Sequence, residues 1–317
     1  MSHTGIRLGV SSCLLGEPVR YDGGHKRDRY VTDVLAQWFE FIPVCPEMGI
    51  GMPAPRPPIR LVSTGRGIRA LGVDDPDRDV TEPLQGYYDR VAPRLAGISG
   101  YILKAKSPSC GMDRVKLYAE DGQPLMTKSR GRFAERLLDA RPLLPVEEEG
   151  RLNDAVLREN FITRVFVYHR WQQLLAARPG VGDLVQFHAD HKYLLMAHNQ
   201  AGYRRLGRLV AEGGKKETRA LLDSYGKELM QILEKKATRK SHANVLQHLA
   251  GYLKKALDSA DRNELVELID RYRLGQVPLV VPVTLLNHHF RRHPDPYIAR
   301  QVYLNPHPAE LMLRNHV

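Results

Sequence analysis

The first half of the chain alternates short apolar runs with loops rich in Gly and Pro. Runs with the length and composition of buried strands occupy residues 6–12, 40–44 and 100–107. Helical periodicity covers residues 33–39, 80–98 and 131–140, and a hairpin-like pair follows the Pro-rich stretch 53–58. Because strands alternate with helices, the pattern predicts an α/β domain with a mostly parallel sheet, which we assign to residues 1–155.

The second half has a different pattern. Leu, Val and Ile recur there at three- and four-residue spacing, which is typical of amphipathic helices. The segments with this spacing are 152–177, 182–212, 215–237, 242–259 and 261–274. The C-terminal segment 277–308 is punctuated by Pro and predicts a short helix. We therefore predict an all-α domain over residues 156–317.

Charge divides the 317 residues in the same way. Residues 1–150 hold 21 Lys and Arg against 20 Asp and Glu, whereas residues 151–317 hold 26 against 16. Eleven of the 13 histidines also lie in the second part. Such asymmetry favours a polyanionic partner for the basic part, most simply nucleic acid, although a basic and merely soluble domain is the alternative.

The sequence also indicates in which cellular compartment the protein is expected. No apolar stretch approaches the ~18 residues that a membrane helix needs, and the N-terminus lacks the apolar region of a signal peptide. Three widely spaced cysteines do not make a secreted disulfide framework. We expect a cytoplasmic protein with no membrane partner, and nothing in the sequence indicates an obligate protein partner.

Candidate chemistry centres on the three cysteines. Cys13, Cys45 and Cys110 are separated by 32 and 65 residues, too far for a CxxC motif, and each follows a predicted strand. The carboxyl ends of strands in such sheets gather ligands, so we expect the three to converge. Three thiolates on a four-iron cluster would leave one iron open. Zinc, a catalytic cysteine and inert cysteines remain alternatives at this stage.

Polar side chains accompany the cysteines. Glu47 lies two residues after Cys45, behind the stiffening Pro46. Ser107 and Ser109 precede Cys110 in a turn that Pro108 makes rigid. Next to an open metal position, a carboxylate can activate water or move a proton, and a hydroxyl can orient substrate.

These motifs carry a resemblance. SSCLLGEPVRYDGG, VCPEMGIGMPAPRPPIRL and KSPSCG resemble the bacterial thiouracil desulfidase family, and the likeness covers about residues 5–150. The resemblance implies that Cys13, Cys45 and Cys110 hold a [4Fe-4S] cluster with one iron not ligated by protein. It also implies that Glu47 transfers a proton and that Ser107 assists.

The second half resembles the helical domain of bacterial tRNA 4-thiouridine desulfidases, over about residues 160–317. The strings that carry this likeness occupy residues 187–199, 238–255, 277–294 and 303–308. It implies a tRNA partner and non-redox hydrolysis of the C4=S bond of 4-thiouridine to uridine and hydrosulfide. A desulfidase of free thiolated bases, or a cluster-bearing RNA-binding regulator, are the alternatives.

Basic clusters in the second half are candidate RNA contacts. They are Arg204, Arg205, Arg208, Lys235, Lys236, Arg239, Lys240 and Lys254. Tyr193, Tyr203, Tyr225 and Tyr252 are interleaved with them and are candidates for stacking on bases. Each charge pair is also compatible with a solvated helix face. His188, His191 and His198 lie on one side of a predicted helix. They are candidates for a metal site, for RNA contacts or for a hydrogen-bonded core.

Overall fold

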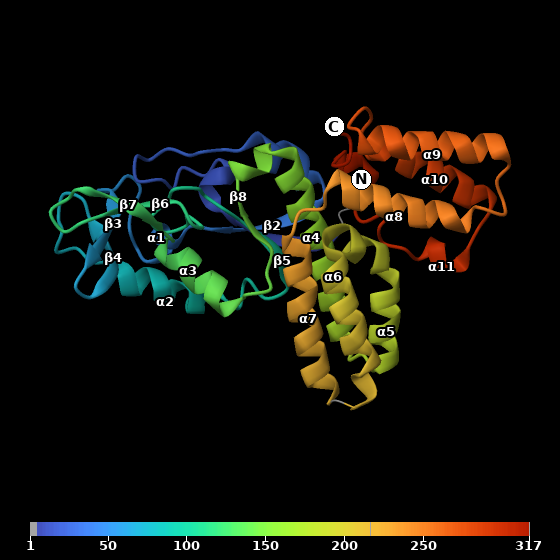
Figure 1. Cartoon of the computed structure of the whole chain (residues 1–317). Helices are drawn as coiled ribbons and strands as arrows, with labels where there is room; N and C mark the ends of the chain where they lie inside the picture. Colours follow the sequence, from blue (N-terminus) through green and yellow to red (C-terminus); the bar gives the residue numbers. More distant parts are fainter. Residues whose placement is uncertain (1–4, 216, 317) are drawn as a thin grey trace. The chain divides into compact units, whose positions relative to one another are not determined.

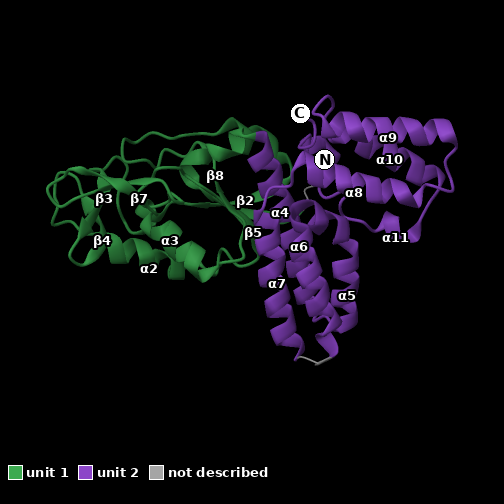
Figure 2. Cartoon of the chain, viewed as in Figure 1, with its two compact units in different colours: residues 1–154 green, residues 155–317 purple. Residues whose placement is uncertain are grey.

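The computed structural model describes residues 5–215 and 217–316. The chain divides into two compact units, Met1–Asp154 and Ala155–Val317 (Figure 2). The first unit combines strands and helices around a parallel sheet, and the second is helical (Figure 1). The predicted fold class is therefore confirmed.

A four-stranded, all-parallel sheet forms the centre of the first unit, with the order β2-β1-β5-β8. The strands are β1 Ile6–Ser11, β2 Phe39–Val44, β5 Ile98–Leu103 and β8 Val146–Glu148. Every residue of β5 is buried, as is typical of a parallel strand covered on both faces. Because β2, β1 and β5 run parallel side by side, their carboxyl ends lie along one edge.

A second four-stranded sheet has the order β4-β3-β6-β7. It consists of β3 Ile59–Thr64, β4 Gly67–Gly72, β6 Val115–Tyr118 and β7 Pro124–Ser129. β3–β4 and β6–β7 are antiparallel hairpins, which a parallel pairing of β3 with β6 joins. The first sheet is thus entirely parallel, whereas the second is mixed, because the short turns within its two hairpins permit only antiparallel pairing there.

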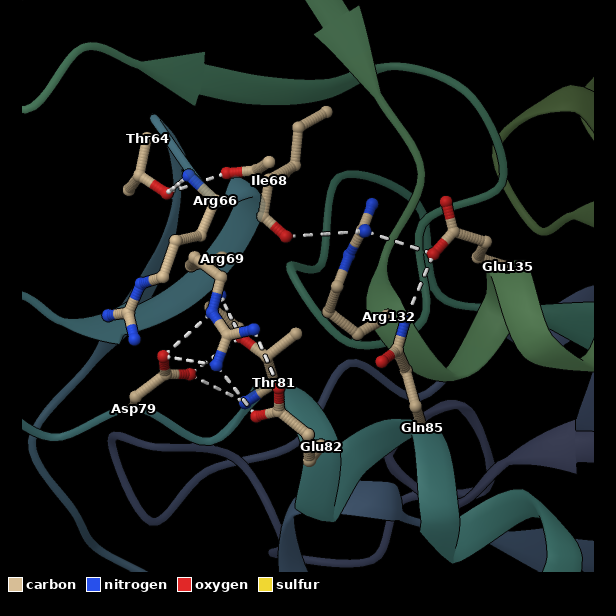
Figure 3. A network of polar contacts seen from close by, with 12 residues as sticks. Thr64, Arg66, Ile68, Arg69, Asp79, Thr81, Glu82, Gln85, Arg132 and Glu135 are labelled. Atoms are coloured by element: carbon tan, nitrogen blue, oxygen red, sulfur yellow. Dashed lines mark hydrogen bonds and ion pairs between the residues drawn. The ribbon is translucent and has the colours of Figure 1, made fainter.

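Polar contacts attach this second sheet to helix α2, Thr81–Val91 (Figure 3). Arg69 of β4 makes ion pairs of 2.6 Å with Asp79 and with Glu82. The Thr81 hydroxyl accepts the backbone N–H of Ala70 at 2.8 Å and donates to Asp79 at 2.6 Å. α2 ends well before residue 98, the predicted limit, because Pro93 cannot continue the helical hydrogen bonds.

Helix α3, Arg132–Ala140, begins against the loop that carries Cys110. The N–H of Arg132 donates to the Pro108 carbonyl at 3.0 Å, and the N–H of Phe133 donates to the Ser109 carbonyl at 3.1 Å. Gly131 comes so close that a Cβ there would lie 2.4 Å from the Ser109 carbonyl carbon. The start of α3 therefore determines where the Cys110 loop lies.

Two local predictions in the first unit need correction. The segment 33–39 is not a regular helix: Tyr30–Val34 forms a π-helical turn and Leu35–Gln37 a 3-10 turn. β2 then begins at Phe39, one residue earlier than expected. The eight residues between Tyr30 and Gln37 are too few for a separate α-helix of ordinary length before the strand.

The second unit consists of helices connected by short turns. The longer ones are α4 Ala155–Ala176, α5 Val181–Asp190, α6 Lys192–Ala211, α7 Thr218–Glu234, α8 Arg239–Tyr252, α9 Ser259–Arg273 and α10 Val280–Arg292. The four-residue α11, Pro296–Ala299, follows α10. α6 packs on α5 and α7, and α8 packs on α9 and α10. Within the described residues, no helix is both long and apolar enough to cross a bilayer.

Local chemistry explains the ends of these helices. The Thr238 hydroxyl accepts the Ser241 N–H at the start of α8, and Asp258 caps α9 through the Asp261 N–H. α10 is longer than the short helix expected from its Pro content. Pro282 lies in its first turn, where a missing N–H breaks no intrahelical hydrogen bond.

The Gly131→Ala variant is expected to lose about 1–3 kcal/mol of stability, because the new Cβ would collide with backbone atoms of the Cys110 loop. Thermal unfolding of the full chain measures this loss. Gly86→Ala is the matched control: nothing lies within 4 Å of its Cβ position in α2, so it should be neutral or stabilising. Equal melting temperatures for Gly131→Ala and the parent chain would contradict the assigned role of Gly131.

Candidate active site

Three loops that follow adjacent parallel strands bring the cysteines to one cavity of about 470 Å³. Cys13 lies in the 3-10 turn Ser12–Leu15 directly after β1. Cys45 follows β2 and begins the short helix α1, Pro46–Gly49. Cys110 lies in the loop after β5. All three are free thiols, with Cys13 and Cys110 buried and Cys45 partly exposed.

The thiols share one electrostatic environment. Burial, together with the neighbouring Cys45, raises the pKa of Cys13 to about 11, against the opposing charges of Lys104 and Arg20. Burial also raises the pKa of Cys110 well above its ordinary value, with contributions from Cys45 and Cys13. Without a bound cation the three thiols therefore stay protonated, and metal binding must release the thiol protons.

The donor set fits a multi-iron cluster better than a single ion. Ligands of one zinc ion all lie about 2.0–2.3 Å from it and therefore close to one another. No group of three His, Cys, Asp or Glu side chains among the described residues is arranged in that way. Thiolates of an iron–sulfur cluster bind different irons and can lie farther apart around a shared cavity.

Glu47 is held in place on both carboxylate oxygens. One oxygen accepts from the Arg56 guanidinium at 2.5 and 2.9 Å, and the other accepts from the Ser109 hydroxyl at 2.8 Å. The Arg56 side chain is 2% exposed and that of Glu47 is 14% exposed. A charge-assisted bidentate pair of this kind fixes orientation as well as charge. The carboxylate of Glu47 therefore lies in the cavity wall as a positioned anion.

Sequence reasoning did not select Arg56. It lies in the Pro-rich stretch after α1, and the only local signal is a single Arg between prolines. Its third contact, from the guanidinium to the Pro53 carbonyl at 3.0 Å, shows that the Pro-rich stretch folds back over Glu47. This reversal places a residue nine positions away against the carboxylate.

The two serines before Cys110 have different contacts. The Ser107 hydroxyl oxygen accepts the backbone N–H groups of Ser109 and Cys110, at 3.2 and 3.1 Å. This side-chain turn shapes the Cys110 loop, and the hydroxyl of Ser107 also lines the cavity. Ser109 is fully buried and is the serine that contacts Glu47. Both serines thus belong to the site.

Cationic side chains also line the cavity. They are Arg20, Lys26, Lys104 and Lys106, in addition to Arg56. Lys104 pairs with Glu149, which also accepts the Ala105 N–H. Lys106 has a left-handed backbone (φ +62°), uncommon outside glycine, directly before Ser107. Positive groups around a cavity favour anionic ligands and products.

All eight basic residues proposed as RNA contacts are exposed: Arg204, Arg205, Arg208, Lys235, Lys236, Arg239, Lys240 and Lys254. Arg204, Arg205 and Arg208 lie on α6, where Arg205 pairs with Glu228 of α7 at 2.5 Å, whereas Arg239 begins α8. His198 of α6 contacts the Lys235 carbonyl at the end of α7. The end of α7 thus contacts the N-terminal part of α6, and the α6 arginines follow a non-helical residue, Asn199, in that helix.

The histidines of α5 and α6 belong to the interior of the second unit. His188 contacts the Tyr225 hydroxyl at 3.2 Å and stacks on Tyr203, and burial lowers its pKa to about 4. His191 contacts the Phe187 carbonyl at 2.7 Å, and burial lowers its pKa to about 3. Hydrogen-bonded, neutral core histidines replace the metal-site alternative.

The candidate stacking tyrosines differ in their exposure to solvent. Tyr193 and Tyr225 are 2% and 0% exposed, so the expectation that they stack on bases is wrong. They fill the core because both lie on the inward faces of their helices. Tyr252 is 44% exposed and stacks on Tyr297 at 6.0 Å between ring centroids.

The N-terminal and C-terminal parts of the chain match two different protein families. Residues 8–149 match the model of the 2-thiouracil desulfurase family, and residues 192–308 match a family described as a protein of unknown function, DUF1722. The uncharacterized protein YbgA of Escherichia coli (strain K12) is 32% identical over 161 residues, which are 50% of this chain and 94% of that protein. The chain belongs to the same family as YbgA.

The N-terminal domain is thiouracil desulfurase-like and is followed by the DUF1722 region. A solved structure of a [4Fe-4S]-dependent thiouracil desulfidase, TudS, is 28% identical in sequence. The match covers 47% of this chain and 94% of the TudS chain, with a TM-score of 0.37. The family match of residues 8–149 lies within the first structural unit and includes all three cysteines.

In the metal-free chain, Cys13 should react with iodoacetamide at pH 8 about 100-fold more slowly than an unburied cysteine, because its pKa is about 11 instead of 9.0. The rate should rise about 100-fold between pH 8 and pH 10, as the thiolate fraction increases. Mass spectrometry of the alkylated peptide follows this reaction. A rate at pH 8 equal to that of glutathione would contradict the buried environment.

Proposed function

We propose that this chain is a desulfidase that hydrolyses the C4=S bond of 4-thiouridine in tRNA. The observation that carries the proposal is one cavity that contains three free thiols and a carboxylate positioned by Arg56. The match of residues 8–149 to the 2-thiouracil desulfurase family supports C–S cleavage as the reaction. Cys13, Cys45 and Cys110 would hold a [4Fe-4S] cluster. When bound, a cluster with one iron free of protein ligands supplies a soft Lewis acid that polarises the thiocarbonyl.

Glu47 performs the proton transfer in this proposal. Its carboxylate accepts a proton from water as the water oxygen attacks C4 of the pyrimidine. The Ser109 hydroxyl and the Arg56 guanidinium fix the carboxylate, so little reorganisation is needed in the transition state. Glu47 then returns its proton to the sulfur as the C–S bond breaks, the new hydroxyl on C4 loses its proton to solvent as the C4=O bond forms, and uridine and hydrosulfide leave. No electron passes to another molecule.

Ser107 and the cationic wall complete the site. The Ser107 oxygen already accepts two backbone N–H groups, so its own O–H is left to donate toward the substrate. Lys104 and Arg20 lower the energy of negative charge that develops in the cavity on C–S cleavage. Hydrosulfide is an anion, and the same charges favour its transient retention.

The tRNA part of the proposal rests on the second unit. Residues 151–317 carry 26 basic against 16 acidic side chains, and the eight candidate RNA contacts are exposed. Lys235, Lys236, Arg239 and Lys240 follow one another at the α7–α8 junction, where they form a continuous basic segment. Phosphate contacts by such residues supply sequence-independent affinity for RNA.

A desulfidase of free thiolated bases is the second candidate. One observation favours it: every residue that lines the cysteine cavity belongs to the first unit, so the reaction centre is complete there. Multiple-turnover sulfide release from thiolated tRNA but not from 4-thiouracil distinguishes the tRNA enzyme from this candidate. It also distinguishes the tRNA enzyme from an RNA-binding regulator without turnover.

Glu47→Gln should slow hydrolysis by roughly 10²–10⁴-fold, because the amide cannot accept the proton. Visible absorbance of the anaerobically reconstituted protein should stay unchanged, since Glu47 is not a thiolate ligand. Nucleoside analysis of tRNA before and after incubation gives the rate. Glu40→Gln, an exposed carboxylate on β2, is the matched control and should retain full activity. A wild-type rate for Glu47→Gln would remove its proposed role.

Lys235→Ala/Lys236→Ala should weaken tRNA binding and make the slope of log K against log salt shallower by about 1–2, as one or two phosphate contacts are lost. Fluorescence anisotropy at several salt concentrations measures both quantities. Lys116→Ala/Lys128→Ala, on the hairpin β6–β7, removes the same charge as a control. Equal slopes for the two double variants would exclude the α7–α8 junction as a phosphate contact.

A further inference from the structure

We infer that the second unit contains a binding pocket for an unstacked nucleotide, separate from the cysteine cavity. The inference rests on the proposed function, because it assigns a specific contact to the RNA substrate. The pocket has a volume of about 300 Å³ and is lined by residues of α10 and α11 and of the turn at residues 304–305. Its volume is at the lower end for small-ligand sites, which suits one base.

Two carboxamides in the pocket wall have free hydrogen-bonding capacity. Asn287 of α10 and Asn305 both line the pocket. Within the described part of the chain, neither carboxamide group makes a hydrogen bond to protein. Each offers two donors and one acceptor, the combination that pairs with adjacent donor and acceptor atoms on a base edge. The pocket therefore presents a pattern that a planar, polar heterocycle satisfies.

Apolar side chains supply surfaces for the faces of the ring. Phe290 lines the wall, and Ile298 and Leu304 are buried beneath it, at 1% and 6% exposure. Stacking on an aromatic ring is the usual way in which proteins hold an unpaired base. An aromatic ring beside two carboxamides fits a nucleobase better than an aliphatic ligand.

Charge gives the bound nucleotide an orientation. Arg291 lines the pocket, and Arg292 next to it is exposed. Asp295 also lines the pocket; one of its carboxylate oxygens accepts the N–H groups of Tyr297 and Ile298, at 2.8 and 2.9 Å. Its second oxygen can accept from an exocyclic amino group and repels phosphate. The base therefore enters the pocket, the phosphate stays near the arginines, and amino-bearing bases are preferred over uracil.

The test is tRNA binding by the reconstituted full-length protein and its Asn287→Ala/Asn305→Ala variant. Neither side chain is fully buried, so their truncation removes hydrogen bonds with little loss of packing. We expect binding to weaken roughly 10- to 100-fold. Because the two residues are neutral, the salt slope should not change, in contrast to loss of a phosphate contact. Asn263→Ala, an exposed asparagine of α9, is the matched control and should bind as the parent does.

A second measurement identifies the bound group. Saturation-transfer NMR with AMP, CMP and UMP should give stronger signals for AMP and CMP than for UMP, and the double variant should lose them. Unchanged tRNA affinity in the double variant, with tRNA binding by the parent intact, would overturn the pocket assignment alone. Absence of tRNA binding by the parent would instead overturn the proposed function. The melting temperature of the double variant should equal that of the parent, so that a loss of tRNA affinity reports the pocket contacts and not the stability of the fold.

Discussion

Parallel pairing of β2, β1 and β5 is the constraint on which the candidate active site depends. Cys13, Cys45 and Cys110 are far apart in the sequence, and they share a cavity because adjacent parallel strands end at the same edge. An antiparallel neighbour would send one of the loops to the opposite edge. The sheet thus brings the three cysteines together, as short CxxC spacing does in many metal sites.

A second set of contacts converts this proximity into a defined site. The N–H groups at the start of α3 donate to the carbonyls of Pro108 and Ser109, and these hydrogen bonds fix the position of the loop after β5. Ser109 in turn donates to Glu47, whose other oxygen is bound by Arg56. These bonds link the loops after β2 and β5 to each other. The carboxylate and the thiol of Cys110 are consequently positioned by one network.

The second unit buries His188 and His191 and exposes all eight candidate basic residues. His188 and His191 are buried, hydrogen-bonded and neutral, although their spacing on one helix side is also that of metal ligands. Lys235, Lys236 and the arginines of α6 remain exposed. In the proposed function the second unit supplies the binding surface and the cavity of the first unit supplies the chemistry.

Local patterns determined much of this protein from sequence alone. The apolar runs predicted β1, β2 and β5, the three- and four-residue spacing predicted the helices of the second unit, and the position of each cysteine after a strand predicted convergence. The expected boundary at residue 155 lies next to the division between Asp154 and Ala155. Tertiary structure alone decided the strand order, the mixed second sheet, the burial of Tyr225 and His188, and the partners of Glu47. Ser109 is 62 residues from Glu47, and no periodic pattern records which distant side chains meet. Such pairs are set by how whole elements pack, because burial and hydrogen bonding must be satisfied for all of them at once.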